Sequence, residues 1–223
     1  MNSDQLQAVR IVERVFGELP LFVKPGMKER DVARTIRRLL KDHGAQKESF
    51  RIITAAGRRT KLVHGFATDR RIRRGDMIMF DFGALYNGWR SDVTRTYVIG
   101  KPDKKQKAIW SLLLAAQRAA IKKVRQGQRC DAIDTAARSM IRKAGYGKNF
   151  RHSLGHGIGK RVHQAPKIGP RNRNRLKAGQ VITIEPGIYI DGWGGMRVED
   201  MVLVTKLGCK VLTKLPKNLK LKC

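Results

Sequence analysis

The chain is poor in acidic residues, in cysteines and in long apolar runs. Only 18 Asp and Glu residues stand against 48 Lys and Arg residues among 223, which gives a net charge of +30. Cys130, Cys209 and Cys223 are odd in number and have no short metal-ligand spacing, which argues against disulfides or a zinc cage and favours free thiols in a reducing compartment. No apolar run has membrane-spanning length and the start lacks the features of a secretory signal, so we expect a cytoplasmic protein with no membrane partner.

Basic residues extend along the chain from Arg10 to Lys222, so the surface is expected to attract polyanions. Non-specific association with ribosomes or other nucleic acid is one interpretation, and a merely solvated basic surface is an equally good one. The densest basic runs are not interleaved with the aromatic residues that single-strand-binding proteins stack on bases. These runs are 58–61, 70–74, 171–175 and 214–222. The charge therefore indicates sequence-blind Coulombic binding and does not name a function.

Two segments about a hundred residues apart repeat one pattern. Residues 74–83 and 178–187 each read as an apolar strand that ends in a carboxylate, Asp81 in the first and Glu185 in the second. An amphipathic helix precedes each strand at an equivalent distance, and no low-complexity linker separates the copies. We therefore predict an internal duplication, with halves of about 1–101 and 102–223, inside a single domain that covers residues 1–223.

Hydrophobic periodicity and turn residues predict the main elements. Helices are expected at about 4–18, 29–43, 104–125 and 130–144. Strands are expected at about 50–56, 76–86, 89–99, 180–190 and 196–205.

The predicted hairpins bring acidic residues together. If Asn87-Gly88 is a two-residue type I′ turn, Asp92 lies opposite Gly83 and is the diagonal neighbour of Asp81 on the same face. A turn centred on Gly192 would set Glu185 opposite Glu199. Four carboxylates in one place repel one another unless cations compensate them, and two divalent ions with oxygen ligands would do so. Four unrelated acids at strand edges are the alternative, which their matched positions in the two copies disfavour.

Three of the five histidines, His152, His156 and His163, fall within twelve residues. A lone histidine is more often structural than a ligand, and His43 at a predicted helix end is interpreted in that way. The cluster is harder to explain structurally, and glycines on both sides of His156 would let a metal or a substrate approach the backbone closely.

The same motifs resemble a known family, the pita-bread dinuclear metallopeptidases, and within it the prolidase and Xaa-Pro aminopeptidase branch. The resemblance covers nearly the whole chain as a catalytic domain only. It implies an α+β pita-bread fold of two pseudo-symmetric halves with an antiparallel sheet core and outer helices. The matching motifs are 81–83, 91–96, 152–159, 184–189 and 197–200.

The resemblance implies a set of five metal ligands. Asp81 would chelate one ion, Asp92 and Glu199 would bridge both, and His156 and Glu185 would bind the other. The two divalent ions would be Mn, Co, Fe or Zn, because carboxylate and imidazole ligands accept all four. A hydroxide shared by the ions would attack the scissile carbonyl, and Glu185 is the expected proton shuttle for that water.

Other residues are expected to contact the substrate. By resemblance, His64 and His163 hydrogen-bond the substrate carbonyl or the tetrahedral intermediate, whereas His152 and Arg197 resemble pocket residues of the proline-specific branch. The predicted activity is therefore an aminopeptidase that hydrolyses the N-terminal peptide bond of peptides, with preference for Xaa-Pro bonds. Val63, where that branch has proline before the histidine, puts substrate choice in doubt.

Four questions stay open at this stage. Typical prolidases have an additional N-terminal domain, and the length of this chain is that of a methionine aminopeptidase, so removal of initiator methionine is the alternative activity. An alternative of another class is a non-catalytic protein that uses the fold to bind ribosomes or nucleic acid. Lys160 and Arg161 could favour an acidic substrate if they lie at the mouth of the active site, and a homodimer is compatible with the sequence.

Overall fold

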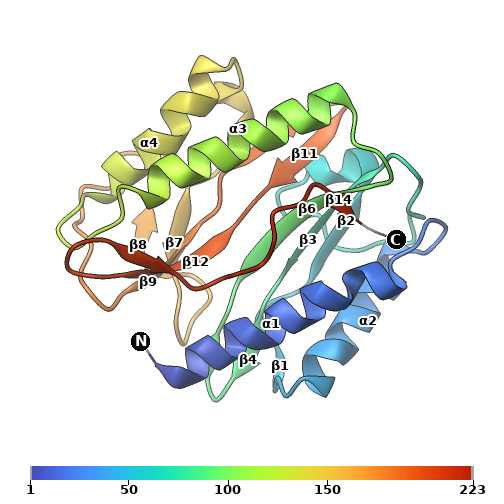
Figure 1. Ribbon diagram of the computed structural model, residues 1–223, viewed down its shortest axis with the longest axis horizontal. Coiled ribbons are helices and arrows are strands. Elements are labelled where there is room, and N and C mark those ends of the chain that lie inside the picture. The colour runs from blue at the N-terminus through green and yellow to red at the C-terminus, as the bar shows by residue number, and fades with distance from the viewer. Residues whose placement is uncertain (1, 222–223) are drawn as a thin grey trace.

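Two pairs of helices lie on opposite sides of a central group of strands (Figure 1). The computed structural model describes residues 2–221. The helices are α1 Ser3–Phe22, α2 Glu29–Asp42, α3 Lys104–Ile121 and α4 Cys130–Lys143, with short 3-10 helices η1 Gly57–Lys61 and η2 Gly147–Asn149. All four predicted helices are confirmed. The first is longer than predicted, because it continues through Pro20 and so places Leu19 in the core.

The first half contains the predicted hairpin around Asn87-Gly88. Both turn residues have positive φ angles, 47° and 77°, as a type I′ turn requires. The register predicted from this turn is confirmed on both sides of Gly83, because Phe82 pairs with Val93 and Leu85 pairs with Arg90. The hairpin is nevertheless divided between a four-stranded sheet and a three-stranded sheet. The first sheet has the order β14 (Lys220–Leu221), β6 (Val93–Ile99), β3 (Met77–Phe82), β2 (Ile53–Ala56), and the second β1 (Lys47–Glu48), β4 (Ala84–Tyr86), β5 (Trp89–Arg90).

The second half repeats this division. The prediction of two continuous strands at 180–190 and 196–205 is wrong, because each divides into two shorter strands. The two strands nearest the turn pair only with each other and form a separate two-stranded ribbon. Ile184 pairs with Asp200 and Gly187 with Arg197 in one register, which sets Glu185 opposite Glu199 as predicted. The five-stranded sheet has the order β13 (Cys209–Val211), β12 (Asp200–Val204), β9 (Val181–Ile184), β7 (Gly155–Gly157), β8 (Gln164–Ile168), and the ribbon pairs β10 (Gly187–Ile190) with β11 (Gly194–Arg197).

Each pair of helices covers its own apolar core. In α2, Val32 and Ile36 are completely buried, and in α4, Ile133 and Ala137 are buried in the equivalent way. The two sets belong to separate clusters, one made mainly by residues before 101 and one mainly by residues after it. Burial of a single Val or Ile side chain contributes about 1.5–3 kcal/mol, so each helix is held mainly by this packing. The α+β class with two similar halves is confirmed, while the limits of a single domain stay a prediction.

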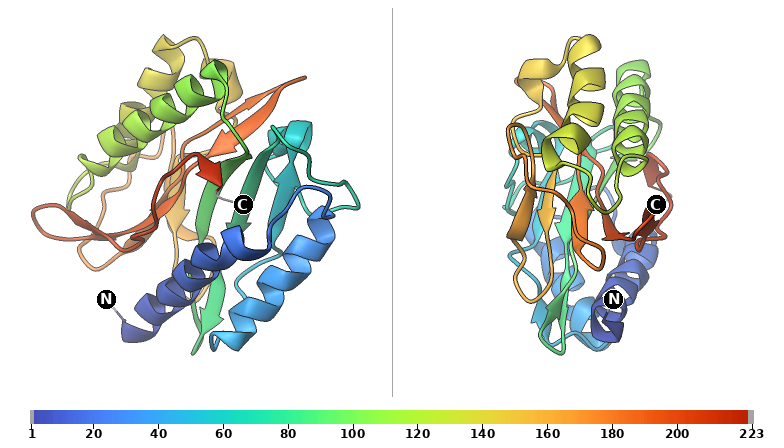
Figure 2. Two further views of the ribbon diagram at one scale, coloured as in Figure 1. Left: turned by 45° about the vertical axis from the view of Figure 1, so that its right-hand side comes forward. Right: turned by 90° about the vertical axis from the view of Figure 1, so that its left-hand side faces the viewer.

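The two halves are joined by polar contacts and by a strand of the second half that pairs with the sheet of the first. Figure 2 shows, from two further directions, the strands of both halves between the helix pairs. The backbone N–H of Glu199 donates to the carbonyl of Thr94 (3.1 Å), and the buried Arg95 pairs with Asp200 (2.7 Å). β14, near the end of the chain, pairs in parallel with β6 of the first half. These contacts hold the strands of the two halves against each other.

The structure also bears on membrane-spanning helices and on the cysteines. Among residues 2–221 there is no helix with the length and apolar character needed to traverse a bilayer. Cys130 and Cys209 are free thiols, as expected, and Cys223 lies outside the described residues.

Candidate metal centre

The five predicted metal ligands line one cavity of about 220 Å³ between the halves. Asp81 lies on β3 and Asp92 follows β5, so the first half supplies two carboxylates. His156 on β7, Glu185 after β9 and Glu199 between β11 and β12 come from the second half. Both glutamates occupy the breaks at which the predicted long strands divide. Four carboxylates, each from a different segment at or near a strand end, therefore line the same cavity.

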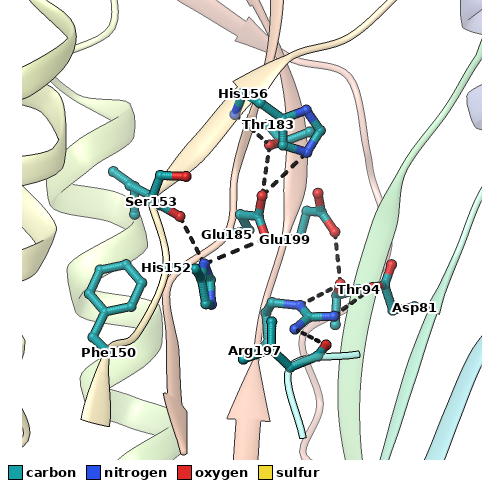
Figure 3. A network of polar contacts seen from close by, with 12 residues as sticks. Asp81, Thr94, Phe150, His152, Ser153, His156, Thr183, Glu185, Arg197 and Glu199 are labelled. Atoms are coloured by element: carbon teal, nitrogen blue, oxygen red, sulfur yellow. Dashed lines mark hydrogen bonds and ion pairs between the residues drawn. The ribbon is translucent and has the colours of Figure 1, made fainter. Parts of the chain in front are cut away.

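The side-chain atoms of this group approach one another closely, and Figure 3 shows four of its members, Asp81, His156, Glu185 and Glu199. Asp92, His156 and Glu199 each offer one ligand atom, and these atoms lie within 4.8 Å of one another. His156 Nε2 is 3.6 Å from Asp92 Oδ2 and 3.4 Å from Glu185 Oε1. Atoms at these separations are too far apart to share good hydrogen bonds. They are arranged around a common point, as ligands of an ion are.

His156 has the tautomer that a metal ligand needs. Its Nδ1 lies 3.0 Å from the carbonyl of Gly157, which only accepts hydrogen bonds, so Nδ1 carries the proton. The lone pair of Nε2 then faces Asp92 and Glu185. Burial lowers the pKa of His156 to about 4, which keeps the ring neutral near pH 7. Such fixing of the second ring nitrogen by a backbone carbonyl is common in metal-binding histidines.

The carboxylates destabilise one another in the absence of cations. Burial, followed by repulsion from Glu199, Asp81 and Glu185, raises the pKa of Asp92 well above its usual range. Burial also raises the pKa of Glu199 strongly and that of Glu185 to about 8. A concentration of buried negative charge that is not internally compensated is what a bound divalent cation stabilises.

Two carboxylate oxygens give an independent test of whether this donor set fits a metal. Asp81 Oδ1 and Glu199 Oε1 are buried and have no hydrogen-bond partner among residues 2–221. A buried acceptor without a partner costs about 1–3 kcal/mol, so a ligand that satisfies these oxygens would stabilise the protein. Because the donors are four carboxylates and one neutral imidazole, the site fits divalent Mn, Fe, Co or Zn.

Arg197 provides the nearest permanent positive charge. Its Nη2 lies 2.5 Å from Asp81 Oδ2, and its Nε donates to Thr94 Oγ1 at 3.0 Å. Thr94 in turn donates to Glu199 Oε2 at 2.7 Å. Arg197 and Thr94 therefore hold one oxygen of each of two carboxylates, and the other oxygen of each is the one without a partner.

A second chain of hydrogen bonds runs from Arg197 to His152. Arg197 Nη1 donates to the hydroxyl of Tyr189 (2.7 Å), and this hydroxyl lies 2.9 Å from His152 Nε2. His152 Nδ1 donates to the carbonyl of Ser153 (2.8 Å), so its Nε2 accepts from Tyr189. Burial and then the charge of Arg197 lower the pKa of His152 to about 3. The ring is neutral and fixed in orientation.

Helix α4 fixes the segment that carries His152. Asp134 and Arg138 form an ion pair on this helix, with 2.6 Å between Arg138 Nε and Asp134 Oδ2. Arg138 also donates to the carbonyls of Phe150 and His152, and Asp134 accepts from the N–H of Leu154. The segment before β7 is thereby attached to a rigid element.

The remaining predicted residues lie at the entrance. His64 and His163 are exposed and line the metal cavity, and both also line an adjoining cavity of about 560 Å³ that contains His152. The ring of His163 packs edge-on against His156, with 4.4 Å between the ring centroids. Neither the His64 ring nor the His163 ring has a hydrogen-bond partner in the described part of the chain, so both rings are free to meet a ligand.

The expectation that the glycines beside His156 admit a metal or substrate is wrong. A Cβ at Gly155 would lie 1.9 Å from the carbonyl oxygen of Thr183, and one at Gly157 would lie 2.3 Å from that of Ala165. The space beside these glycines is filled by the backbone of the neighbouring strands. The glycines are needed so that β7 can pack closely and present His156.

Sequence analysis missed several residues of this site. Thr94 and Tyr189 lie inside the motifs that carried the resemblance, yet their hydrogen bonds depend on tertiary contacts. Arg51 lines the metal cavity and stacks on Phe66, with 4.0 Å from its Cζ to the ring centroid, and no local signal indicated it. Lys160 and Arg161 are exposed and line neither cavity.

Comparison with known proteins agrees with this geometry. A Xaa-Pro dipeptidase of Pyrococcus furiosus is 47% identical over 197 residues, which cover 88% of this chain and 57% of the relative. The chain thus spans little more than half the length of that relative.

Solved structures show the same fold. The prolidase of Pyrococcus furiosus has a TM-score of 0.93 and 44% identity over 96% of this chain and 63% of its own. An X-Pro aminopeptidase of Thermotoga maritima has a TM-score of 0.95 and 40% identity over 97% of this chain and 62% of its own. The predicted pita-bread fold is confirmed. The model of metallopeptidase family M24 matches residues 5–206, and the chain belongs to this family.

Proposed function

We propose that this chain is a metal-dependent peptidase that hydrolyses the N-terminal peptide bond of short peptides with proline in the second position. The observation that carries the proposal is the convergence of Asp81, Asp92, His156, Glu185 and Glu199 on one cavity between the halves. The names of its relatives, a Xaa-Pro dipeptidase and an X-Pro aminopeptidase, support the substrate class. Because the chain spans only part of these relatives, their activity is assigned to it as a proposal.

The family implies divalent metal ions, and we assign two ions to the five residues. Asp81 would hold one ion, His156 and Glu185 the other, and Asp92 and Glu199 would contact both. Bound ions of this kind supply Lewis acidity and lower the pKa of water enough to give a nucleophile at neutral pH. Mn, Co, Fe and Zn all suit the donors, and manganese is the first to test.

The protein groups around the site would orient the substrate and transfer protons. The carboxylate of Glu185 would accept the proton of the attacking water and deliver it to the leaving amine. The rings of His64 and His163 have no hydrogen-bond partner in residues 2–221 and would donate to the substrate carbonyl oxygen as negative charge develops on it. Arg197, oriented by Tyr189, and His152 would line the pocket for proline.

A peptide series tests the proposal. The protein is loaded with Mn²⁺ or Co²⁺ and offered Ala-Pro, Ala-Pro-Ala and Met-Ala-Ser peptides, with a chelator-treated sample as control. Cleavage of either proline peptide, abolished by the chelator and restored by metal, is the expected result, and the shorter or longer peptide identifies dipeptidase or aminopeptidase activity. Cleavage of Met-Ala-Ser alone would assign initiator-methionine removal instead. Failure to cleave any peptide by metal-loaded protein would contradict a catalytic role.

Cellular location and assembly stay predictions. A cytoplasmic location, a homodimer and association of the basic surface with polyanions such as ribosomes are expected from the sequence. Fractionation of the native host and size-exclusion chromatography of the purified chain test the first two expectations.

A further inference from the structure

Two cavities outside the metal centre lie on either side of the turn that precedes β3. The first, of about 610 Å³, we name the Arg–Trp cavity, and the second, of about 620 Å³, the lysine cavity. Neither shares a lining residue with the metal cavity. The adjacent residues Arg73 and Arg74 line one cavity each, so the two form neighbouring parts of one surface.

The Arg–Trp cavity contains positive charge in excess of its acidic partners. Arg70 is neutralised by Asp76 (2.8 Å), and Arg59 pairs with Glu29 (3.2 Å). Asp76 is the only acidic residue that lines this cavity within the described chain. The side chains of the two other arginines, Arg58 and Arg73, are left without an ionic partner in residues 2–221.

The lysine cavity has no acidic residue in its described lining. Its four basic residues come from the end of α1, the turn before β3, the end of β6 and strand β14. They are Lys24, Arg74, Lys101 and Lys220, and none has an ionic partner among residues 2–221. Together the cavities present six uncompensated cations. An arrangement brought together from five chain segments is specific to the folded protein and is not a run of charge in the sequence.

An aromatic residue accompanies these cations. Trp193, in the turn between β10 and β11, lines the Arg–Trp cavity and is half-buried. Lys105, in the first turn of α3, has its Nζ 5.0 Å from the centre of the Trp193 ring. Both elements reach the upper right of Figure 1, toward η1 and the arginines it carries. No sequence pattern indicated this pairing, because Trp193 lies far along the chain from the basic runs.

We propose that the Arg–Trp cavity and the lysine cavity form a binding surface for single-stranded nucleic acid. Successive phosphates would lie beside the six uncompensated cations, and a base would stack on Trp193. Cations that track a backbone combined with an aromatic platform are the general means by which proteins hold single strands. A small anion would need one cavity, whereas two cavities on either side of Arg73-Arg74 match a ligand with repeated charges.

Fluorescence anisotropy with a labelled 20-nucleotide oligouridylate tests this surface in about 150 mM salt. The double variants Arg58→Glu/Arg73→Glu and Lys24→Glu/Lys101→Glu change one cavity each. Lys206→Glu/Lys210→Glu is the matched control, because it alters the charge equally at two exposed lysines, one in the β12–β13 turn and one on β13, that have no ionic partner in residues 2–221. Each cavity variant is expected to bind roughly tenfold more weakly, and the control to stay within about twofold of the unmodified chain.

The salt dependence reports how many phosphates the surface neutralises. The slope of log affinity against log salt concentration should become shallower by about 0.7 for each phosphate that a cavity variant no longer neutralises. Equal reductions of affinity in the cavity variants and the control would show a response to net charge alone and would overturn the proposal. So would stronger binding to phosphatidylglycerol vesicles than to the oligonucleotide.

Trp193→Phe tests the stacking part of the proposal with little change in packing. The oligonucleotide is expected to quench part of the tryptophan fluorescence of the unmodified chain, and this quenching should be lost in the variant. In Trp193→Leu, which removes the aromatic ring, the preference for the single strand over a duplex of the same length should fall several-fold. Unchanged quenching and preference would refute a base stack on Trp193. Circular dichroism of each variant shows that the fold is intact, so the result does not depend on the peptidase proposal.

Discussion

The metal cavity and the basic surface around residues 73–76 both hold charge that the protein does not neutralise, but of opposite sign and in different surroundings. At the metal cavity Asp81, Asp92 and Glu199 are buried, and two carboxylate oxygens have no partner in the described chain. At the basic surface the unpaired cations are exposed and hydrated. Burial makes unpaired charge expensive, whereas exposure makes it nearly free. The comparison teaches that a bound cation would stabilise the first site, whereas the second site would attract anions with little effect on stability.

Removal of one buried carboxylate should have the largest effect on activity. Asp92→Asn keeps the shape of the side chain and removes its charge, so we expect the rate of Ala-Pro cleavage to fall by at least about a thousandfold, equivalent to about 4 kcal/mol. Asp191→Asn is the control, because Asp191 is exposed and paired with Lys61 and Arg151. Rates are measured at saturating Mn²⁺. Retention of most of the activity by Asp92→Asn would refute its assignment as a ligand.

The thermal stability of the same variant sharpens the comparison. Without metal, Asp92→Asn should leave the melting temperature unchanged or raised, because repulsion among the buried carboxylates is relieved. With Mn²⁺ the unmodified chain should gain about 2.7 kcal/mol at a metal concentration one hundred times the dissociation constant, and the variant should gain much less. Differential scanning calorimetry with and without metal distinguishes the two. A large loss of stability in the metal-free variant would instead indicate a structural role.

Matched truncations compare the two helix pairs. Ile36→Ala in α2 and Ile133→Ala in α4 each remove a completely buried side chain, and each should lower the free energy of unfolding by about 2–5 kcal/mol. Arg37→Ala, at an exposed ion pair with Glu48, serves as the control and should cost less than about 1 kcal/mol. Urea unfolding gives the values. A negligible effect of either isoleucine would contradict the assignment of a separate core to each half.

Loss of the Tyr189 hydroxyl should have a smaller effect. Tyr189→Phe removes the link between Arg197 and His152 without changing the packing of the ring, so we expect the KM for Ala-Pro to rise roughly tenfold or less, with a smaller change in kcat. A fall in kcat with an unchanged KM would place Tyr189 in the chemical step and not in substrate orientation.

The smallest effect is expected at the basic surface. Because Arg58 and Arg73 are exposed and have no ionic partner in residues 2–221, Arg58→Glu/Arg73→Glu should change the free energy of unfolding by less than about 0.5 kcal/mol and leave peptide cleavage unaltered. Urea unfolding and the Ala-Pro assay measure both. A decrease in stability of about 2 kcal/mol or more would show that these arginines support the fold.

The sequence was sufficient for the features that local chemistry controls. Asn87-Gly88 determines its turn and thereby the register that brings Asp81 and Asp92 to one face, and the repeated pattern pointed to Glu185 and Glu199. The breaks within the predicted long strands were missed, because they arise where the chain passes from one sheet to another. The contacts of Arg51 with Phe66 and of Trp193 with Lys105 were also missed. Such contacts depend on how distant segments pack, which periodicity and turn residues do not encode.

The metal content of the folded chain tests the central claim most directly. The purified protein, equilibrated with Mn²⁺ and freed of unbound metal, is analysed by inductively coupled plasma mass spectrometry beside the Asp92→Asn and Asp191→Asn variants. We predict about two metal ions per chain for the unmodified protein and for Asp191→Asn, and fewer for Asp92→Asn. Metal below one ion per chain in the unmodified protein, or equal metal in all three, would contradict a centre built from these carboxylates.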